Sequence, residues 1–238
     1  MVKILDFTQK PNTAKKFITI AIDGPAGSGK TSVSRALASA LNFQYFDTGA
    51  LYRTIGYYFL TKKINTKNIQ NISNILCNIN IDFKFKNKFQ LMFLDNQEIT
   101  DKINSESVGL ITSELSKIPE IRCFLLNIQR NIAKFNNIIM NGRDIGSVVL
   151  PDADIKIFLT ASAEVRAFRR FEQNKKTKDI NYVQILGNIK KRDFEDINRK
   201  DCPLIAPKNS IIFDNSNYNF EESINKLLGI INKKIIFL

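Results

Sequence analysis

Two features of the sequence together predict an α/β protein with a five-stranded, doubly wound parallel sheet in three layers. Short apolar runs rich in β-branched residues recur along the chain, and segments with helical periodicity separate them. The predicted strands are residues 17–22, 44–46, 138–140, 155–159 and 211–213. Because such sheets bind ligands at the carboxyl ends of their strands, functional side chains are expected there. The charged residues that follow these ends are Asp23, Asp47, Arg143, Asp144 and Asp214.

The first predicted strand leads directly into a phosphate-binding loop. The pattern G-x-x-x-x-G-K-T is complete at residues 24–31, and a helical pattern with apolar residues on one face follows at residues 33–41. Strand, glycine loop and helix in this order disfavour the alternative of a glycine turn that merely caps a helix. Lys30 is expected to reach the β- and γ-phosphates, and the Thr31 hydroxyl to ligate Mg²⁺. The residues expected to bind the nucleoside triphosphate are Gly24, Pro25, Ala26, Gly27, Ser28, Gly29, Lys30, Thr31 and Ser32.

The rest of the chain suggests one main domain with an insertion. Residues 1–16 form an expected N-terminal extension, and residues 17–64 and 109–238 the expected core. Residues 65–108 are rich in Asn and Lys, and two strand-like runs at 81–86 and 89–94 predict a β-hairpin there. A long helical region is predicted from 108 to 135 with a break near Pro119, and a C-terminal helix from about Phe220.

Composition limits the classes of protein that this chain can represent. An apolar fraction of 44% in 238 residues is enough for a hydrophobic core, and no apolar run has the length of a membrane span or a signal peptide. Three widely spaced cysteines, Cys77, Cys123 and Cys202, suggest neither a disulfide framework nor a metal site, so the cytoplasm is the expected setting. The net charge of +12 fits either nucleic acid or a small polyanionic substrate.

The absence of histidine removes the commonest general base. Phosphoryl transfer to an acceptor that is itself a phosphate needs no such base, because the acceptor is already largely ionised at neutral pH. It needs guanidinium groups to offset the repulsion between two polyanions. The candidates are Arg53, Arg122, Arg143, Arg192 and Arg199, although any one of them taken alone fits a solvated surface role.

Five strings of sequence resemble one family. They are I-D-G-P-A-G-S-G-K at 22–30, F-D-T-G-A-L-Y-R at 46–53, N-G-R-D-I-G-S-V-V at 141–149, I-K-I-F-L-T-A-S-A-E-V-R at 155–166 and K-R-D-F-E-D-I-N-R-K-D-C-P-L at 191–204. With them the chain resembles the bacterial cytidylate kinases, a branch of the nucleoside monophosphate kinases, from Phe17 to the C-terminal helix. The combination of the second and third strings is specific to this family, whereas the phosphate-binding loop alone is widespread.

The resemblance implies ATP- and Mg²⁺-dependent phosphorylation of CMP and dCMP by a cytoplasmic monomer without nucleic-acid or membrane partners. The insertion would be the subdomain that binds the nucleoside monophosphate. The basic section at about 166–192 would be a helical lid that closes over ATP and excludes water. A solvated, charged helix pair is the alternative for that section.

The resemblance also implies roles for individual residues. Asp144 would accept a hydrogen bond from the cytosine amine, and Ser113 and Arg122 would complete the base pocket. Asp196 would meet the ribose hydroxyls. The residues expected to act in catalysis are Lys30, Arg143, Arg192 and Arg199.

Three arginines, Arg53, Arg143 and Arg199, would hold the acceptor phosphate, and Arg192 would lie near the transferring phosphoryl group. Thr48 and Tyr52 would line the monophosphate side. Helix surface remains the alternative for Ser113 and Arg122, and a core aromatic for Tyr52. Four residues depart from the family pattern and bear on affinity: Asn104, Asn141, Ser147 and Glu195.

Three other functions fit parts of the sequence. A kinase for UMP or AMP would share the phosphate-binding loop. A nucleic-acid-binding module would explain the basic charge, although the lysines are dispersed and no RNA-binding signature occurs. A nucleotide-binding structural protein without turnover would be expected to lack Lys30 or Arg192, and both are present.

Overall fold

The computed structural model describes residues 17–66, 72–174 and 181–237, so the predicted extension at 1–16 lies outside the described residues. The chain divides into two compact units. We call residues 18–43 together with those from 139 onward the P-loop unit, and residues 44–138 the hairpin unit. Each is described by itself below. Of the helices in these described ranges, none has both the length and the apolar character needed to cross a bilayer.

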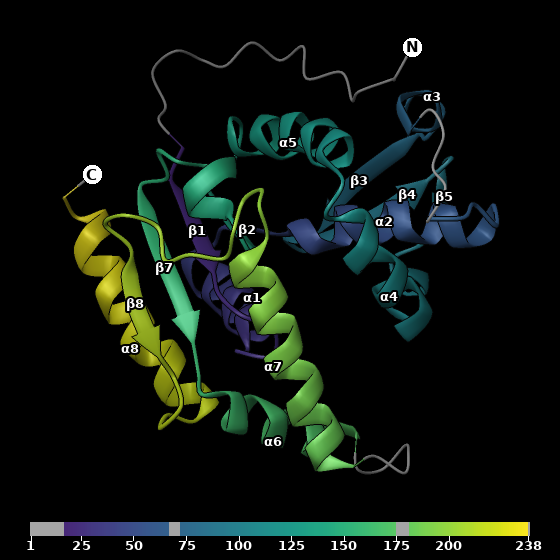
Figure 1. Cartoon of the computed structure of the whole chain (residues 1–238). Helices are drawn as coiled ribbons and strands as arrows, with labels where there is room; N and C mark the ends of the chain where they lie inside the picture. The colour runs from purple at the N-terminus through teal and green to yellow at the C-terminus, as the bar shows by residue number, and fades with distance from the viewer. Residues whose placement is uncertain (1–16, 67–71, 175–180, 238) are drawn as a thin grey trace. The chain divides into compact units, whose positions relative to one another are not determined.

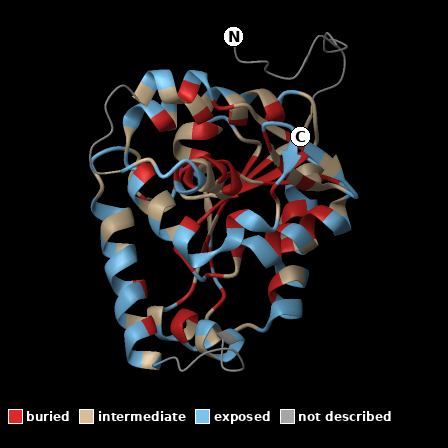
Figure 2. Ribbon diagram, turned by 90° about the vertical axis from the view of Figure 1, so that its right-hand side faces the viewer, coloured by how far each residue is buried: buried red, intermediate tan, exposed pale blue. Residues whose placement is uncertain are grey.

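The strands of the P-loop unit lie in the order β6-β1-β7-β8. Their bounds are Thr19–Asp23 for β1, Ile138–Gly142 for β6, Ile155–Thr160 for β7 and Ile211–Asp214 for β8. β1, β7 and β8 are labelled in Figure 1. β7 runs parallel to both β1 and β8, so these strands end at the same edge of the sheet. β1 and β6 are buried over most of their length, and β7 alternates buried apolar residues (Ile155, Ile157 and Leu159) with half-buried ones (Figure 2). That pattern is typical of a parallel sheet covered by helices.

Four α-helices and one π-helical turn complete the P-loop unit. They are α1 (Lys30–Leu41), η2 (Ile145–Val149), α6 (Ala163–Asn174), α7 (Tyr182–Asn198) and α8 (Phe220–Ile235). α1 packs against α8, and α6 packs against α7. The α6–α7 pair buries Ala167, Ile185 and Ile189 between its helices. Residues 175–180, which belong to the predicted lid, lie outside the described ranges.

The hairpin unit combines β2 (Gln44–Asp47), β3 (Ile81–Lys86), β4 (Phe89–Leu94) and β5 (Gln97–Glu98) with helices. β3 and β4 form an antiparallel hairpin, and both residues of its two-residue turn have positive φ, 49° at Asn87 and 71° at Lys88. This turn geometry matches the twist of the two strands. The helices are α2 (Thr48–Thr61), α3 (Ile72–Cys77), η1 (Lys102–Asn104), α4 (Glu106–Leu115) and α5 (Pro119–Ala133).

The prediction of an α/β fold with a mainly parallel sheet is confirmed, and each of the five predicted strands is present as β1, β2, β6, β7 or β8. The count of five strands is wrong, because the described residues contain eight. The predicted hairpin does not stand apart from the predicted core strands, since β4 pairs in parallel with β2. The Gln90 side chain fixes this pairing by accepting a hydrogen bond from Asp47 N and donating one to Asp47 O.

Candidate functional site

The loop between β1 and α1 has the backbone conformation that its glycines allow. Gly24 has a φ of +149°, and a Cβ atom there would lie 1.9 Å from the carbonyl oxygen of Leu159. Gly29, the N-cap of α1, has a left-handed φ of 86°. The loop therefore delivers its backbone N–H groups to the N-terminus of a twelve-residue helix, where they and the helix dipole favour an anion.

The Lys30 side chain lies back across this loop. Its ammonium donates to Pro25 O at 2.6 Å and to Ser28 Oγ at 3.4 Å, and only 6% of the residue is exposed. Thr31 and Ser32, in the first turn of α1, are exposed. The loop thus presents a hydroxyl and a buried cation next to the anion-binding N-terminus of the helix.

Asp23, the last residue of β1, connects this loop to the turn after β6. Its Oδ1 accepts from Ile145 N and its Oδ2 from Gly146 N, both at 2.7 Å. The carboxyl group is almost fully buried, at 1% exposure. Burial raises the pKa of Asp23 to about 6 from its ordinary value of 3.8, and the two backbone hydrogen bonds oppose that rise.

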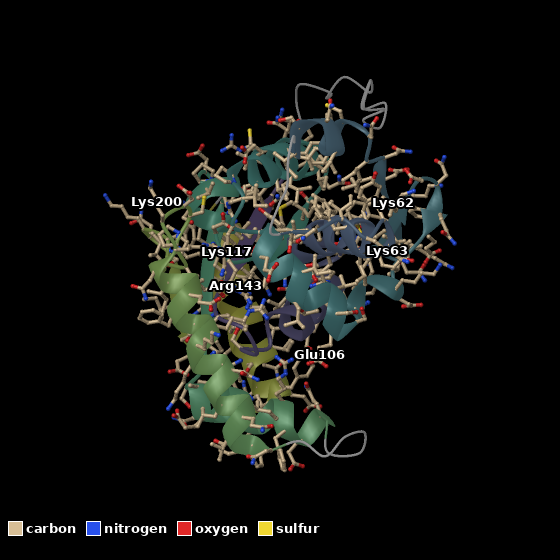
Figure 3. All side chains as sticks on the ribbon, turned by 45° about the vertical axis from the view of Figure 1, so that its right-hand side comes forward. Lys62, Lys63, Glu106, Lys117, Arg143 and Lys200 are labelled. Carbon is tan, nitrogen blue, oxygen red and sulfur yellow. The ribbon has the colours of Figure 1, made fainter. Side chains whose placement is uncertain are left out.

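Four predicted site residues of the P-loop unit lie together. Arg143 Nε donates to Asp196 Oδ2 at 2.9 Å (Arg143 is labelled in Figure 3). Arg199 Nη2 lies 3.9 Å from Asp144 Oδ1, and Arg199 Nε also donates to Cys202 O. Arg143 and Asp144 directly follow β6, whereas Asp196 lies on α7 and Arg199 is the C-cap of that helix. Each pair therefore joins the end of β6 to α7. The result is a partly buried cluster of two cations and two anions.

Arg192 lies one turn before Asp196 on α7, on an exposed part of the helix. Its position on the same helix as Asp196 is what links it to that cluster. Glu195, one of the departures from the family pattern, follows on α7 and is half-buried.

The predicted residues of the hairpin unit form two pairs. Arg53 Nη2 is 2.8 Å from Asp47 Oδ2, while Asp47 Oδ1 accepts from Gly49 N at 3.0 Å and caps α2. The Arg122 guanidinium lies 5.8 Å from the centre of the Tyr52 ring and donates to Ser116 O. Tyr52 is half-exposed, and its ring lies against a cation. Both observations disagree with the alternative that Tyr52 is a plain core aromatic.

The remaining predicted residues of this unit lie on neighbouring helices. Thr48, the first residue of α2, is buried, and Ser113 is half-buried on α4. α2 packs against both α4 and α5, the helix that carries Arg122. The fold thus places all five predicted residues of the hairpin unit on α2 and on the two helices that pack against it.

Asn215 contacts the phosphate-binding loop, although the sequence alone did not identify it as a site residue. Its Nδ2 donates to Ser28 O at 3.0 Å, its Oδ1 accepts from Arg169 Nη1 at 3.0 Å, and 3% of it is exposed. It follows β8 directly, so its place at a strand end was a signal that could have identified it. Its partners Ser28 and Arg169 are 187 and 46 positions away in the sequence and gave no local pattern.

The described residues do not form a metal site made of protein side chains alone. They fit a site in which the substrate supplies most of the metal ligands. In the described ranges no group of three or more His, Cys, Asp or Glu side chains could hold a metal ion. Both oxygens of Asp23 are already bound to backbone N–H groups. Mg²⁺ in such sites usually has one or two protein ligands and takes the others from substrate phosphates and water. The exposed Thr31 hydroxyl fits the role of a protein ligand.

Comparison with known proteins agrees with this geometry. The sequence profile of the family described as cytidylate kinase matches residues 20–233. A cytidylate kinase of Caldicellulosiruptor saccharolyticus is 44% identical over 221 residues, which cover 92% of this chain and 98% of that protein. One of Fervidobacterium nodosum is 41% identical over 216 residues, which cover 90% and 96%.

Similarity to solved structures is more distant. A shikimate kinase from Bacteroides thetaiotaomicron aligns over 90% of this chain and 98% of its own, at 14% identity and a TM-score of 0.48. This likeness is too low to add to the evidence from sequence. The profile match and the identities above 40% over nine-tenths of the chain decide the question: the chain belongs to the cytidylate kinase family.

Proposed function

We propose that the protein transfers the γ-phosphoryl group of ATP, as its Mg²⁺ complex, to the 5′-phosphate of CMP or dCMP, giving ADP and CDP or dCDP. Family membership gives the reaction. The observation that supports it within this chain is the Arg143–Asp196 and Asp144–Arg199 cluster at the edge of the sheet where β1 ends in the phosphate-binding loop.

The donor side of the proposed site is the loop from Gly24 to Ser32. Its backbone N–H groups hold the β- and γ-phosphates, and Lys30 leaves the carbonyl of Pro25 to bind them. Thr31 holds Mg²⁺, which when bound neutralises charge on the phosphate oxygens. The ammonium group is already buried beside the loop, so little reorganisation is required of it.

The acceptor side combines cations for the phosphate with a carboxylate for the base. Arg53, Arg143 and Arg199 hold the CMP phosphate, and each is paired with an acidic residue that screens its charge in the free protein. Asp144 accepts the cytosine amine, which uracil lacks.

Residues on the helices complete the acceptor site. Asp196 binds the ribose hydroxyls, and Arg192 lies at the transferring phosphoryl group. Ser113 and Arg122 complete the base pocket, and Thr48 and Tyr52 line the phosphate side.

The proposed chemical step needs no histidine, and the sequence contains none. The acceptor oxygen of CMP belongs to a phosphate whose second pKa is about 6, so it attacks without a general base. The protein contributes positioning and positive charge, which are the main requirements of phosphoryl transfer. We place this activity in a cytoplasmic monomer with a three-layer, doubly wound core, a monophosphate-binding subdomain at 65–108 and a helical lid at about 166–192.

The first test is a coupled assay of ADP release with CMP, dCMP, UMP and AMP on the wild type and Asp144→Ala. We expect turnover with CMP and dCMP, and a fall in kcat/KM for CMP of at least about tenfold in the variant, the effect of losing one base-reading contact. Asp152→Asn, at an exposed turn after η2, is the control and should leave turnover unchanged. Turnover with CMP no higher than with ATP alone would contradict the proposed function.

A further inference from the structure

The arginine that begins the basic section does not face solvent. Arg166, in the first turn of α6, is 5% exposed. Its Nε donates to Ala161 O at 2.8 Å and its Nη1 to Ala26 O at 3.0 Å. Nη1 and Nη2 also donate to the two oxygens of Asp193, at 3.0 Å and 2.6 Å. A guanidinium group in this bidentate arrangement holds its partner in both distance and orientation.

These hydrogen bonds join three segments of the P-loop unit. Ala26 belongs to the phosphate-binding loop, Ala161 directly follows β7, and Asp193 lies on α7. The loop approaches closely here, since a Cβ atom on Gly27 would lie 3.4 Å from Arg166 Cβ. One buried side chain therefore connects the loop to the helix that carries Arg192.

Asp193 is the residue next to Arg192, so fixing one limits the position of the other. Neighbouring residues of an α-helix differ by about 1.5 Å along its axis. The helix pair also behaves as a unit, because Ala167, Ile185 and Ile189 form a buried cluster between α6 and α7. Phe171 and Tyr182 add an edge-to-face contact at 6.2 Å.

We propose that Arg166 is a positioning residue for phosphoryl transfer: by binding Ala26 O and the Asp193 carboxylate together, it sets the distance between the phosphate-binding loop and Arg192. This inference rests on the proposed function, in which Arg192 meets the transferring phosphoryl group. It assigns Arg166 no contact with substrate. In-line transfer is sensitive to displacements of about 1 Å, so the consequence should appear in the rate of the chemical step.

The same two helices contain a matched control. Lys190 Nζ lies 3.0 Å from Glu164 Oε1, and this pair also joins α7 to α6. It is exposed, with 58% and 57% of the two side chains accessible, and each side chain is paired with the other rather than with Asp193. The Glu164–Lys190 pair thus reproduces the helix-to-helix link without the connection to Ala26.

The experiment compares Arg166→Lys, Asp193→Asn and their double variant with Glu164→Gln. Arg166→Lys keeps the charge and the aliphatic stem but not the fork of donors. We expect Arg166→Lys and Asp193→Asn each to lower kcat by about 10- to 100-fold with KM for CMP nearly unchanged. The double variant should lose little more than either single one, because both remove the same link. Glu164→Gln should stay within about twofold of wild type.

Thermal unfolding separates positioning from stability. Each rate is measured well below the melting temperature of its variant, where a residue that only stabilised the helix pair would leave kcat unchanged. Folded Arg166→Lys and Asp193→Asn proteins with kcat near that of wild type would overturn the inference. If Asp193→Asn does not fold, Arg166→Lys alone decides the question by the same comparison.

Measurements on the wild type and Arg192→Gln separate a failure of the proposed function from a failure of the positioning role of Arg166. A wild type that turns over CMP and an Arg192→Gln variant that does not would support the proposed function, whatever the effect of Arg166→Lys. A wild type inactive with CMP would refute the proposed function. Turnover that is lost in Arg192→Gln but kept in Arg166→Lys would refute the positioning role alone.

Discussion

Asp23 is the clearest case of a single residue whose environment opposes its charge. Burial raises its pKa, the hydrogen bonds from Gly146 N and Ile145 N lower it, and the charges of Asp144 and Lys30 act in opposite directions. The balance leaves a pKa of about 6. At neutral pH the ionised carboxylate accepts both hydrogen bonds, whereas the protonated form has one good acceptor oxygen.

A raised pKa predicts the sign of a pH effect on stability. The folded protein holds the Asp23 proton up to about pH 6, while the unfolded chain releases it near pH 3.8. The contribution of Asp23 to the free energy of unfolding is therefore fully present below pH 3.8 and is lost as the pH rises through about 6. Between these two pKa values the free energy of unfolding falls by about 1.4 kcal/mol for each pH unit, about 3 kcal/mol in all.

The measurement is urea unfolding of the wild type and Asp23→Asn between about pH 4 and pH 7.5, a range that spans the transition expected from linkage. Asparagine does not titrate, so the wild type should lose stability relative to the variant as the pH rises. A difference that stays constant, or that moves in favour of the wild type, would show that the pKa of Asp23 is not raised.

The sequence suggested candidate site residues but did not show which side chains they pair with. Arg143, Asp144 and Arg199 lie in two of the strings that resemble the family, and the fold brings them into one cluster with Asp196. Arg166 was assigned to a solvated or mobile basic section, yet it is buried. Its partners, Ala26 and Asp193, lie 140 and 27 positions away. Sequence periodicity reports which side of a helix is apolar and cannot show a carbonyl that a distant loop supplies.

At the scale of an element, the phosphate-binding loop depends on a glycine that no other residue can replace. Gly24→Ala would place a Cβ atom 1.9 Å from Leu159 O, a backbone atom of β7, at a φ of +149° that L-residues rarely adopt. The loop or the β1–β7 pairing must move. We expect ATP affinity to fall by about 100-fold or more, since a displaced loop loses several hydrogen bonds to phosphate of about 1 kcal/mol or more each.

Gly229→Ala is the control for that substitution. Gly229 is exposed within α8, and a Cβ atom there would meet nothing within 4 Å. Alanine should raise the stability of the protein by about 1 kcal/mol through helix propensity, without changing ATP binding. Calorimetric titration with ATP and thermal unfolding measure the two effects. Equal ATP affinity in the two variants would mean that Gly24 is not essential to the loop.

The hairpin shows what element prediction can and cannot reach. An alternating stretch at 81–86 and a second, mostly apolar run at 89–94, with Asn87 and Lys88 between them, predicted a hairpin, and it is present. The sequence did not show that β4 also pairs with β2, because Asp47 and Gln90 are 43 positions apart and neither strand has a signal for its neighbour. Local pattern determines a strand, whereas the order of strands depends on contacts across the chain.

At the scale of the whole molecule, the net charge of +12 is the feature that function explains least directly. Both nucleotides in the proposed reaction are polyanions, and a basic protein attracts them over distances of about a Debye length. Within the described residues, however, many of the cations have acidic partners, as the Arg53–Asp47, Arg143–Asp196 and Arg166–Asp193 pairs show. The excess charge is thus a property of the whole surface more than of the site.

This distribution predicts how the protein should respond to RNA. A surface of dispersed lysines binds single strands without sequence preference, and such affinity falls by roughly 300-fold between about 50 mM and 200 mM salt when about six phosphates are contacted. We therefore expect RNA binding that disappears near physiological salt and that does not inhibit CMP turnover there. Fluorescence anisotropy with a random-sequence RNA oligonucleotide, measured beside the coupled assay at each salt concentration, tests both statements. RNA binding that persists at physiological salt and competes with CMP would mean that a nucleic-acid site overlaps the proposed one, because a diffuse charge cannot resist screening in that way.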